Sequence, residues 1–291
     1  MKVLIVTMPG SSFISGELTG AFEARGHEVD LRYYGDLSIE IGSDRNISFG
    51  GEQIGNYGAA ILRMAEGKSM IWYKDILTRH LMEHNIPVIN GASFVKFPHL
   101  GKLVQNFELS RAHLPVVSTR LYSTKDQALQ GEKDFPVMVK PNFGRLGEGI
   151  VKAHHGHELE ITLGERATDY LIQDFLPTAQ DYRIIVIGGR ALPRMMKKKA
   201  REGSHVTNFS QGGIVTSEDT TPELADLAER AAAVFESDYC GVDIMYDEHN
   251  KPHILEINRS ANFKGYHQAT GDNVPLKLVE HVESLIGKTK I

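Results

Sequence analysis

The sequence lacks several features, and each absence excludes a class of protein. It has one cysteine, Cys240, among 291 residues, so no internal disulfide can form and a reducing compartment is expected. No apolar stretch reaches the roughly 18 residues that a membrane-spanning helix needs. The N-terminal segment, residues 1–7, is too short an apolar run for a signal peptide. We therefore expect a cytoplasmic protein with no membrane segment.

Familiar cofactor motifs are also missing. The first predicted strand is followed by residues 8–12, Met-Pro-Gly-Ser-Ser, without the Gly-x-Gly-x-x-Gly fingerprint of NAD-dependent enzymes. The glycine-rich stretch at residues 142–149 does not end in Gly-Lys-Ser or Gly-Lys-Thr, so it is not a Walker A loop. The formal net charge is −5, from 37 acidic and 32 basic residues. This charge gives no global attraction to nucleic acid or to an anionic membrane.

What the sequence contains indicates a mixed α/β chain. Apolar residues make up 41% of the sequence and charged residues 24%, which is enough apolar material for a sizeable core. Predicted strands at 3–7, 29–33, 59–63 and 87–90 alternate with predicted helices at 17–25 and 72–85. This alternation predicts a parallel α/β domain. Residues 42–58 are rich in glycine, serine and asparagine, so we expect them to be irregular.

The rest of the chain mixes strands and helices in a different order. Strands are predicted at 135–140, 150–153, 171–175, 182–187 and 191–197. Helices are predicted at 102–114, 124–130, 222–236 and 274–285, with Ser123 or Thr124 as an N-cap and Pro222 in a first turn. Gly188, Gly189 and Arg190 predict a hairpin turn.

Carboxylates cluster near the end of the sequence. Asp243 and Glu256 lie in two apolar runs that alternate in strand fashion around a polar turn, which predicts a hairpin. Asp243, Glu256 and Asn258 could then converge as oxygen donors for Mg²⁺, which takes few carboxylates and adds water and nucleotide phosphates. The alternative, an acidic residue on an exposed sheet face, fits this pattern about as well on its own.

A lysine precedes the glycine-rich stretch. Lys140 ends a predicted strand, and Gly144, Gly147 and Gly149 follow in the loop. Glycine lets backbone N–H groups approach an anion, and lysine adds a point charge for phosphate. Taken alone, a glycine-rich surface hairpin explains this pattern better.

Two further segments are weaker indicators. Residues 173–176 form a strand end before a polar turn with Asp181 and Arg183, where backbone groups could face an adenine and a carboxylate could face a ribose. Solvated turn acids explain this pattern equally simply. The basic run at 197–201 could form a wall around phosphates or an acidic substrate, or it could be an exposed charged strand.

The order of these segments is more specific than any one of them. A strand-end lysine, a glycine loop, a hinge-like strand end, a basic strand and an Asp…Glu-x-Asn hairpin together resemble the ATP-grasp superfamily, and within it the RimK-like carboxylate–amine ligases. The resemblance covers roughly residue 63 to the last residue. It implies an ATP-grasp fold, two α+β lobes gripping ATP, preceded by a parallel α/β domain. The implied divisions are 1–98 for that domain, 99–172 for the small lobe and 173–291 for the large lobe.

The resemblance also implies roles for individual residues. The nucleotide would be held by Lys102, Lys140, Gly144, Gly147, Gly149, Gln173, Asp174, Phe175, Leu176, Asp181, Lys199 and Arg201. The metal ion, Mg²⁺ or Mn²⁺, would be held by Asp243, Glu256 and Asn258. Arg183 and Asn208 would lie near the transferred phosphoryl group and the acyl intermediate.

The implied reaction joins a carboxylate to an amine at the expense of ATP. A substrate carboxylate, such as that of an amino acid, attacks the γ-phosphate, and the amine then displaces phosphate from the acyl phosphate. The metal and lysines would neutralise the charge of these reactants. The family would add an amino acid such as glutamate to a peptide, protein or small-molecule acceptor. A homo-oligomer is expected, with no nucleic acid or membrane partner.

Two departures from the family pattern keep other interpretations open. Val206 stands where relatives commonly have an arginine, and residues 258–262 read Asn-Arg-Ser-Ala-Asn where relatives have Asn-x-Ser-Pro-Gly. One alternative is therefore an ATP-binding module without catalysis. Another is a ligase of a different ATP-grasp subfamily, either peptide-modifying or similar to D-alanine–D-alanine ligase. Arg63, Lys198, Lys199 and Arg201 favour an acidic substrate.

Overall fold

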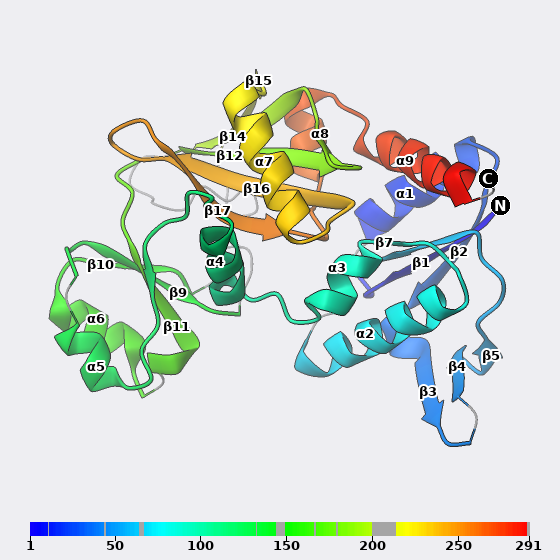
Figure 1. Cartoon of the computed structure of the whole chain (residues 1–291), viewed down its shortest axis with the longest axis horizontal. Coiled ribbons are helices and arrows are strands. Elements are labelled where there is room, and N and C mark those ends of the chain that lie inside the picture. The colour runs from blue at the N-terminus through cyan, green and yellow to red at the C-terminus, as the bar shows by residue number, and fades with distance from the viewer. Residues whose placement is uncertain are drawn as a thin grey trace.

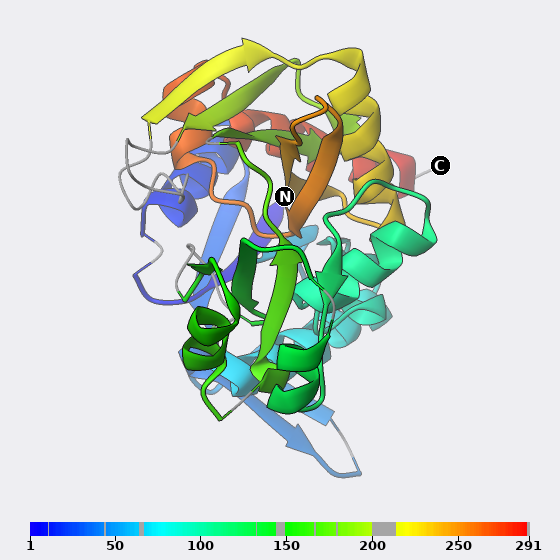
Figure 2. The same ribbon diagram turned by 90° about the vertical axis from the view of Figure 1, so that its left-hand side faces the viewer.

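The structure is a computed structural model, and its elements form three bodies that Figures 1 and 2 show from two directions. It describes residues 1–10, 12–43, 45–63, 67–131, 133–143, 149–165, 167–178, 180–199 and 214–289. The N-terminal domain lies at one end, the small lobe at the other, and the large lobe joins them. In the described part of the chain, no helix has both the length and the apolarity to cross a membrane.

A parallel sheet forms the centre of the N-terminal domain, as the alternating pattern predicts. Its strands, in spatial order, are β2 (Glu28–Tyr33), β1 (Lys2–Thr7), β6 (Ala59–Leu62) and β7 (Val88–Ile89). Its main helices are α1 (Ser12–Ala24), α2 (Gly67–Glu83) and α3 (Gly91–Lys96). The turn after α1 depends on Gly26, whose φ of +77° is a left-handed conformation that glycine adopts at little cost.

A small antiparallel sheet extends from this domain, and the prediction of irregular structure at 42–58 is wrong here. Strands β3 (Leu37–Ile41), β4 (Arg45–Phe49) and β5 (Glu52–Gln53) form a meander. Ile47 and Phe49 are buried against the domain core together with Leu37. The turn residues Gly50 and Gly51 have positive φ angles, so the glycines that suggested irregularity in fact close a hairpin.

The small lobe is an antiparallel sheet with two helices against one side. Its strands, in spatial order, are β10 (Val151–Ala153), β9 (Val137–Pro141), β11 (Tyr170–Asp174) and β8 (Thr119–Arg120). Helices α5 (Lys125–Gln130) and α6 (Gly156–Leu163) share its apolar core. The Thr124 side chain accepts the Gln127 N–H, which confirms the predicted N-cap. Strand β11 continues past the expected boundary at residue 172.

The large lobe is a longer antiparallel sheet. Its strands, in spatial order, are β15 (Ile214–Asp219), β14 (Arg194–Lys199), β12 (Gln180–Ile187), β16 (Tyr239–Tyr246) and β17 (Pro252–Asn258), and β13 (Arg190–Ala191) pairs with β12. The predicted turn between β12 and β13 is confirmed, with positive φ angles at Gly188 and Gly189. Helices α7 (Pro222–Val234) and α4 (Lys102–Arg111) contribute to the core on one face, where Cys240 is buried.

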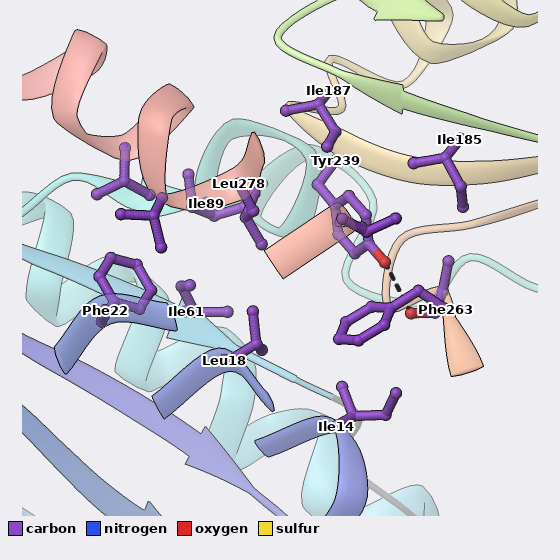
Figure 3. Packing of buried hydrophobic residues seen from close by; sticks show 14 of the residues in the cluster. Ile14, Leu18, Phe22, Ile61, Ile89, Ile185, Ile187, Tyr239, Phe263 and Leu278 are labelled. Atoms are coloured by element: carbon purple, nitrogen blue, oxygen red, sulfur yellow. Dashed lines mark hydrogen bonds between the residues drawn. The ribbon is translucent and has the colours of Figure 1, made fainter. Parts of the chain in front are cut away.

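The other face of this sheet is divided along its strands. One half carries Ile185, Ile187 and Tyr239, which pack against the N-terminal domain with helices α8 (Lys264–Thr270) and α9 (Val274–Thr289). Figure 3 shows this packing, with α1 residues Ile14 and Leu18 facing the large-lobe side chains. The other half of the same face carries charged side chains, which form the candidate site.

Candidate active site

The charged half of the face takes residues from four strands. Arg183 on β12 lies opposite Asp243 on β16, and Asp243 lies opposite Glu256 on β17. Asp181, two residues before Arg183, lies opposite Lys198 on β14. Directly opposed residues, and residues two apart on one strand, project from the same face of a sheet. The five side chains therefore form a continuous stripe, which we call the charged stripe.

The charged stripe is tied together by short ion pairs. The Arg183 guanidinium donates from Nε to Asp243 Oδ1 at 2.8 Å and from its second terminal nitrogen to Oδ2 at 2.6 Å. Lys198 Nζ lies 3.0 Å from Asp181 Oδ2 and 3.3 Å from Asp243 Oδ2. Asp181, Lys198 and Asp243 are all buried. These contacts fix the side chains in one arrangement, because each charge loses its water and depends on its neighbours.

The electrostatics of the stripe follow from this pairing. Burial by itself would raise the pKa of Asp243, but the charges of Arg183 and Lys198 outweigh burial and lower that pKa below its usual value. Burial would likewise lower the pKa of Arg183, and Asp243 outweighs it so that the pKa is raised. Both groups are therefore ionised at neutral pH. Three carboxylates, those of Asp181, Asp243 and Glu256, stand beside two cations, so the formal charge of the stripe is −1.

The three predicted metal ligands lie on one face of the β16–β17 hairpin. Asn258 is two residues beyond Glu256, and Asp243 is opposite Glu256. The register shifts between Asp243 and Ile244, where one extra residue on β17 forms a bulge. Bulges redirect side chains next to functional sites. The predicted hairpin is present, and its register places the three oxygen-bearing residues on one face.

These residues fit a magnesium ion that is shared with a phosphate. Among the residues that the structure describes, no group of three His, Cys, Asp or Glu side chains could hold a metal by itself. Mg²⁺ needs only one or two carboxylates when phosphates and water complete its shell. Asp243 already accepts three charged bonds of the about four that a carboxylate can accept. Glu256, which forms no ion pair within the described part of the chain, is the more available carboxylate.

Lys140 faces the stripe from the small lobe. It lies near the end of β9, as predicted, and burial lowers its pKa to about 8. The Glu256 and Asp181 carboxylates oppose this shift, and the Lys102 ammonium adds to it. Lys102 is the first residue of α4. Charges from the small lobe, α4 and the large lobe therefore act on one another across the space between the lobes.

Asn142 connects the two lysines. Its side-chain oxygen accepts the Leu103 N–H at 3.1 Å, and its carbonyl oxygen accepts the Lys102 N–H at 3.3 Å. It therefore caps the first turn of α4 from a different element. Gly101 allows this approach, because a Cβ there would lie 2.9 Å from the Phe143 ring. The strand that carries Lys140 and the helix that begins at Lys102 are thereby held in a fixed relation.

Gly149 is the predicted loop glycine that the structure describes. Its φ is +70°, and a Cβ on it would lie 3.0 Å from Pro141 Cγ, so both conformation and space require glycine. Gly144, Gly147, Arg201 and Asn208 lie outside the described residues, as does Val206.

The segment predicted to contact adenine crosses from the small lobe to the large lobe. Gln173 is buried and donates to Thr119 Oγ1 at 2.7 Å, and the Asp174 carboxylate accepts from Arg120 at 2.6 Å. Both side chains thus bind β8 within the small lobe. Phe175 and Leu176 follow in the crossing itself. The Lys152 ammonium lies 3.7 Å from the centre of the Phe175 ring.

Three contributors to this region were given no nucleotide, metal or catalytic role from the sequence, although Lys198 was among the basic residues that favour an acidic substrate. Lys198 joins the charged stripe, whereas the predicted Lys199 is exposed and, by strand alternation, projects from the opposite face. Asn142 and Lys152 reach the site through contacts made in three dimensions. For Lys198, the alternation with Arg183 and Asp181 on a paired strand would have been a usable indication. For Asn142 and Lys152, the sequence holds none.

Comparison with known proteins identifies relatives of the same length and fold. A family model described as a RimK-like ATP-grasp domain matches residues 103–282. Proteins named probable alpha-L-glutamate ligase are similar to the chain over nearly its full length. The one from Maridesulfovibrio salexigens is 28% identical over 305 residues, covering 100% of this chain and 98% of that protein. The one from Vibrio atlanticus is 28% identical over 293 residues, covering 97% and 95%.

Solved structures share the fold at lower sequence identity. The ATP-grasp ligase PsnB, in complex with a phosphomimetic variant of its minimal precursor, Mg and ADP, aligns with a TM-score of 0.70 and 20% identity over 97% of both chains. The macrocyclase MdnC from Microcystis aeruginosa, bound with precursor peptide MdnA, aligns with a TM-score of 0.73 and 15% identity over 98% of this chain and 99% of that one. The predicted ATP-grasp fold is confirmed, and the chain belongs to the RimK-like ATP-grasp family of carbon–nitrogen ligases.

Proposed function

We propose that this protein is an ATP- and Mg²⁺-dependent carboxylate–amine ligase that forms an amide bond through an acyl phosphate. Its carboxylate or amine substrate would include an amino acid such as glutamate, joined to a peptide, protein or small molecule. The names of the similar alpha-L-glutamate ligases support the glutamate part of this proposal. The complexes of PsnB and MdnC with precursor peptides support a peptide partner.

One observation carries the proposal. Lys140 is a half-buried cation of the small lobe whose pKa is affected by Glu256 and Asp181 of the large lobe. A half-buried cation near carboxylates, without a short ion pair to them in the described residues, suits a ligand that carries negative charge and binds a divalent cation. A triphosphate with Mg²⁺ meets both conditions, because its oxygens pair with lysines and share the metal with carboxylates.

Each part of the site would then have a defined task. Lys140 and Lys102 would bind phosphate oxygens, Phe175 and Leu176 would line the adenine, and Asp181 would bind the ribose. Glu256, Asn258 and Asp243 would hold Mg²⁺, which supplies charge neutralisation at the phosphates when it is bound.

The chemical step needs no side-chain nucleophile. A substrate carboxylate oxygen bonds to the γ-phosphorus while the bond to the β-phosphate oxygen breaks, which yields the acyl phosphate and ADP. The amine nitrogen then bonds to the acyl carbon, the bond to the phosphate oxygen breaks, and the amine loses a proton. The Arg183 guanidinium, kept charged by Asp243, would stabilise the negative charge on the transferred phosphoryl group.

The test is release of ADP and phosphate by the purified protein. The assay contains ATP, Mg²⁺, an amino-acid panel and peptide acceptors, and mass spectrometry identifies the product. We expect Glu256→Gln to lower ADP release by at least about tenfold. Glu248→Gln, an exposed residue of the turn in the same hairpin, is the matched control and should retain activity. ATP binding without ADP release across the panel would instead favour a non-catalytic module, and absence of both would contradict the proposal.

A further inference from the structure

The parallel sheet of the N-terminal domain has a position where ligands commonly bind. Strands β2 and β6 flank β1 on opposite sides, so the chain reverses its winding direction between β1 and β6. Crevices at the carboxyl ends of strands at such a reversal are the usual ligand sites of open parallel sheets. Thr7 is the last residue of β1, and Arg63 directly follows β6. The Arg63 N–H donates to the Val6 carbonyl at 2.8 Å, so the two strand ends lie side by side.

Arg63 is a buried cation without a counter-ion in the described residues. Its side chain is 5% exposed. It donates to the Ser260 carbonyl at 3.3 Å and lies beside the Tyr239 hydroxyl, and burial lowers its pKa. No carboxylate of the described part of the chain forms an ion pair with it, whereas Arg183 binds both oxygens of Asp243. Buried charges are normally paired, so Arg63 is held in a state that an anionic ligand would stabilise.

Thr7 provides a second, independent observation at the same place. It is 1% exposed, and its hydroxyl has no hydrogen-bond partner among the described residues. Val6 is in register with Leu62, so Thr7 lies next to Arg63 on the neighbouring strand. Both project from the same face as Ile5 and Ile61, which turns toward the large lobe. The free hydroxyl and the guanidinium are thus presented to the same space.

The segment that follows the β16–β17 hairpin of the large lobe, which includes Ser260 and Ala261, lies next to Arg63. The Tyr239 hydroxyl donates to the Ala261 carbonyl at 2.8 Å, a bond that Figure 3 shows beside Phe263. Gly241 allows the segment to lie on β16, because a Cβ there would lie 3.0 Å from Ala261 Cβ and 3.5 Å from Arg183 Cδ. Arg63, through Ser260 and Tyr239, is therefore connected to the same strand face that carries Asp243.

The spacing along β16 separates this position from the phosphoryl site. Tyr239, Gly241 and Asp243 alternate on one face, and four residues of strand span about 13 Å at roughly 3.3 Å per residue. A carboxylate bound by Arg63 is for this reason not the carboxylate that reacts at the charged stripe. It would be a second carboxylate of the same substrate, held while the reactive end reaches the nucleotide.

We propose that Arg63 and Thr7 form an anchoring subsite for a non-reacting carboxylate of the substrate, so that the enzyme selects acidic amino acids or peptides with a free carboxylate. The inference rests on the proposed ligase function. The guanidinium, whose present partners are the Ser260 carbonyl at 3.3 Å and the uncharged Tyr239 hydroxyl, would form two parallel charge-assisted hydrogen bonds to the carboxylate, and the Thr7 hydroxyl would donate a third. Lys198 does not serve this purpose, because Asp181 and Asp243 already neutralise it.

The experiment measures thermal unfolding with L-glutamate or L-glutamine, two probes that differ by one carboxylate charge. We expect glutamate to raise the Tm of the native protein more than glutamine does. Arg63→Met should abolish this difference, and Arg63→Lys should weaken glutamate binding by about tenfold because the bidentate geometry is lost. Arg194→Met removes another arginine that donates to a backbone carbonyl, that of Thr270 at 2.6 Å, and should keep the preference.

Thr7→Val keeps the test valid if the arginine variants fold poorly. Removing a buried hydroxyl without a partner should leave the Tm of the free protein unchanged or higher, yet reduce its response to glutamate. A glutamate preference that survives in Arg63→Met or Thr7→Val, equal responses to the two probes, or no response to glutamate would overturn the inference. ATP with Mg²⁺ is added in a separate arm, so loss of nucleotide binding, which would count against the ligase function, is distinguished from loss of glutamate binding.

Discussion

Arg183 and Asp243 face each other across adjacent antiparallel strands, and the guanidinium holds both carboxylate oxygens at 2.8 and 2.6 Å. Asp243 is buried and the Arg183 side chain is only 14% exposed, so loss of one partner leaves a poorly solvated charge without compensation. We expect Arg183→Met and Asp243→Asn each to lower the free energy of unfolding by roughly 3 kcal/mol. The double variant should lose less than the sum, with a coupling of about 1–3 kcal/mol in urea unfolding.

The pH dependence of this pair provides a further check. The folded-state pKa of Asp243 is lowered from 3.8, so its contribution to stability is complete above that value and is lost as the pH falls through the folded-state pKa. The stability difference between the native protein and Asp243→Asn should consequently shrink below about pH 4. A constant difference across that range would show that the carboxylate charge is not the stabilising element.

The charge of Lys140 should lower the free energy of unfolding of the protein without ligand. Burial lowers its pKa from 10.5 to about 8, so the folded protein carries a poorly solvated charge below pH 8. Lys140→Met should raise the unfolding free energy by roughly 1–3 kcal/mol at neutral pH. The gain should decline between pH 8 and 10.5, where only the unfolded chain still binds the proton.

The same variant should bind ATP at least about tenfold more weakly in calorimetric titration, because a phosphate contact is lost. The native protein should lose ATP affinity as the pH rises through about 8, when Lys140 loses its charge. Lys133→Met, a lysine of the same lobe that donates to backbone carbonyls of Leu129 and Gly131, is the control. Unchanged ATP affinity in Lys140→Met would remove this lysine from the nucleotide site.

Lys198 and Lys199 are neighbours that the structure separates to opposite faces of the sheet. Lys198→Met should destabilise the protein by roughly 2–4 kcal/mol, because it leaves Asp181 and Asp243 with one cation between them. Lys199→Met, at an exposed position, should change stability by no more than about 0.5 kcal/mol. Chemical denaturation of the two variants measures this contrast. Equal effects would contradict the assigned faces.

Asn142 should contribute both to stability and to the relative position of Lys102 and Lys140. Asn142→Ala leaves the Leu103 N–H without its cap and should cost about 1 kcal/mol. It should also raise the KM for ATP several-fold by loosening Lys102 relative to Lys140. Thr124→Ala removes the N-cap of α5 at a similar cost in stability and should leave the KM unchanged. The comparison separates positioning from a general loss of stability.

Much of the fold follows from periodicity and local chemistry. The apolar run of β1, the helix at α2 and the caps at Gly26 and Thr124 were predictable because each depends on neighbouring residues. The β3–β4 meander was not predictable, because its glycines fit an irregular loop equally well. Its strands are stabilised by burial of Ile47 and Phe49 against distant residues.

In the candidate site, too, the residues that depend on three-dimensional contacts could not be predicted from the sequence. Asp243, Glu256 and Lys140 could be selected by motif order, since their spacing is a property of the sequence. The choice between Lys198 and Lys199 required strand register, because a shift of one residue reverses the face. The burial of Arg63 could not be predicted from the sequence, because it depends on Ser260, about 200 residues later, whose carbonyl accepts a hydrogen bond from Arg63.

Helix α9 packs against α1, an element that the ribosome makes about 250 residues earlier. Val274, Leu278, Val279 and Val282 of α9 pack with Ile14, Leu18 and Phe22 of α1 in one apolar cluster. On a ribosome that makes the chain in order, the first domain therefore emerges without the segment that completes its interior. Its apolar surface stays uncovered until residues 274–282 have been translated, so α1 is made long before the helix that completes its packing.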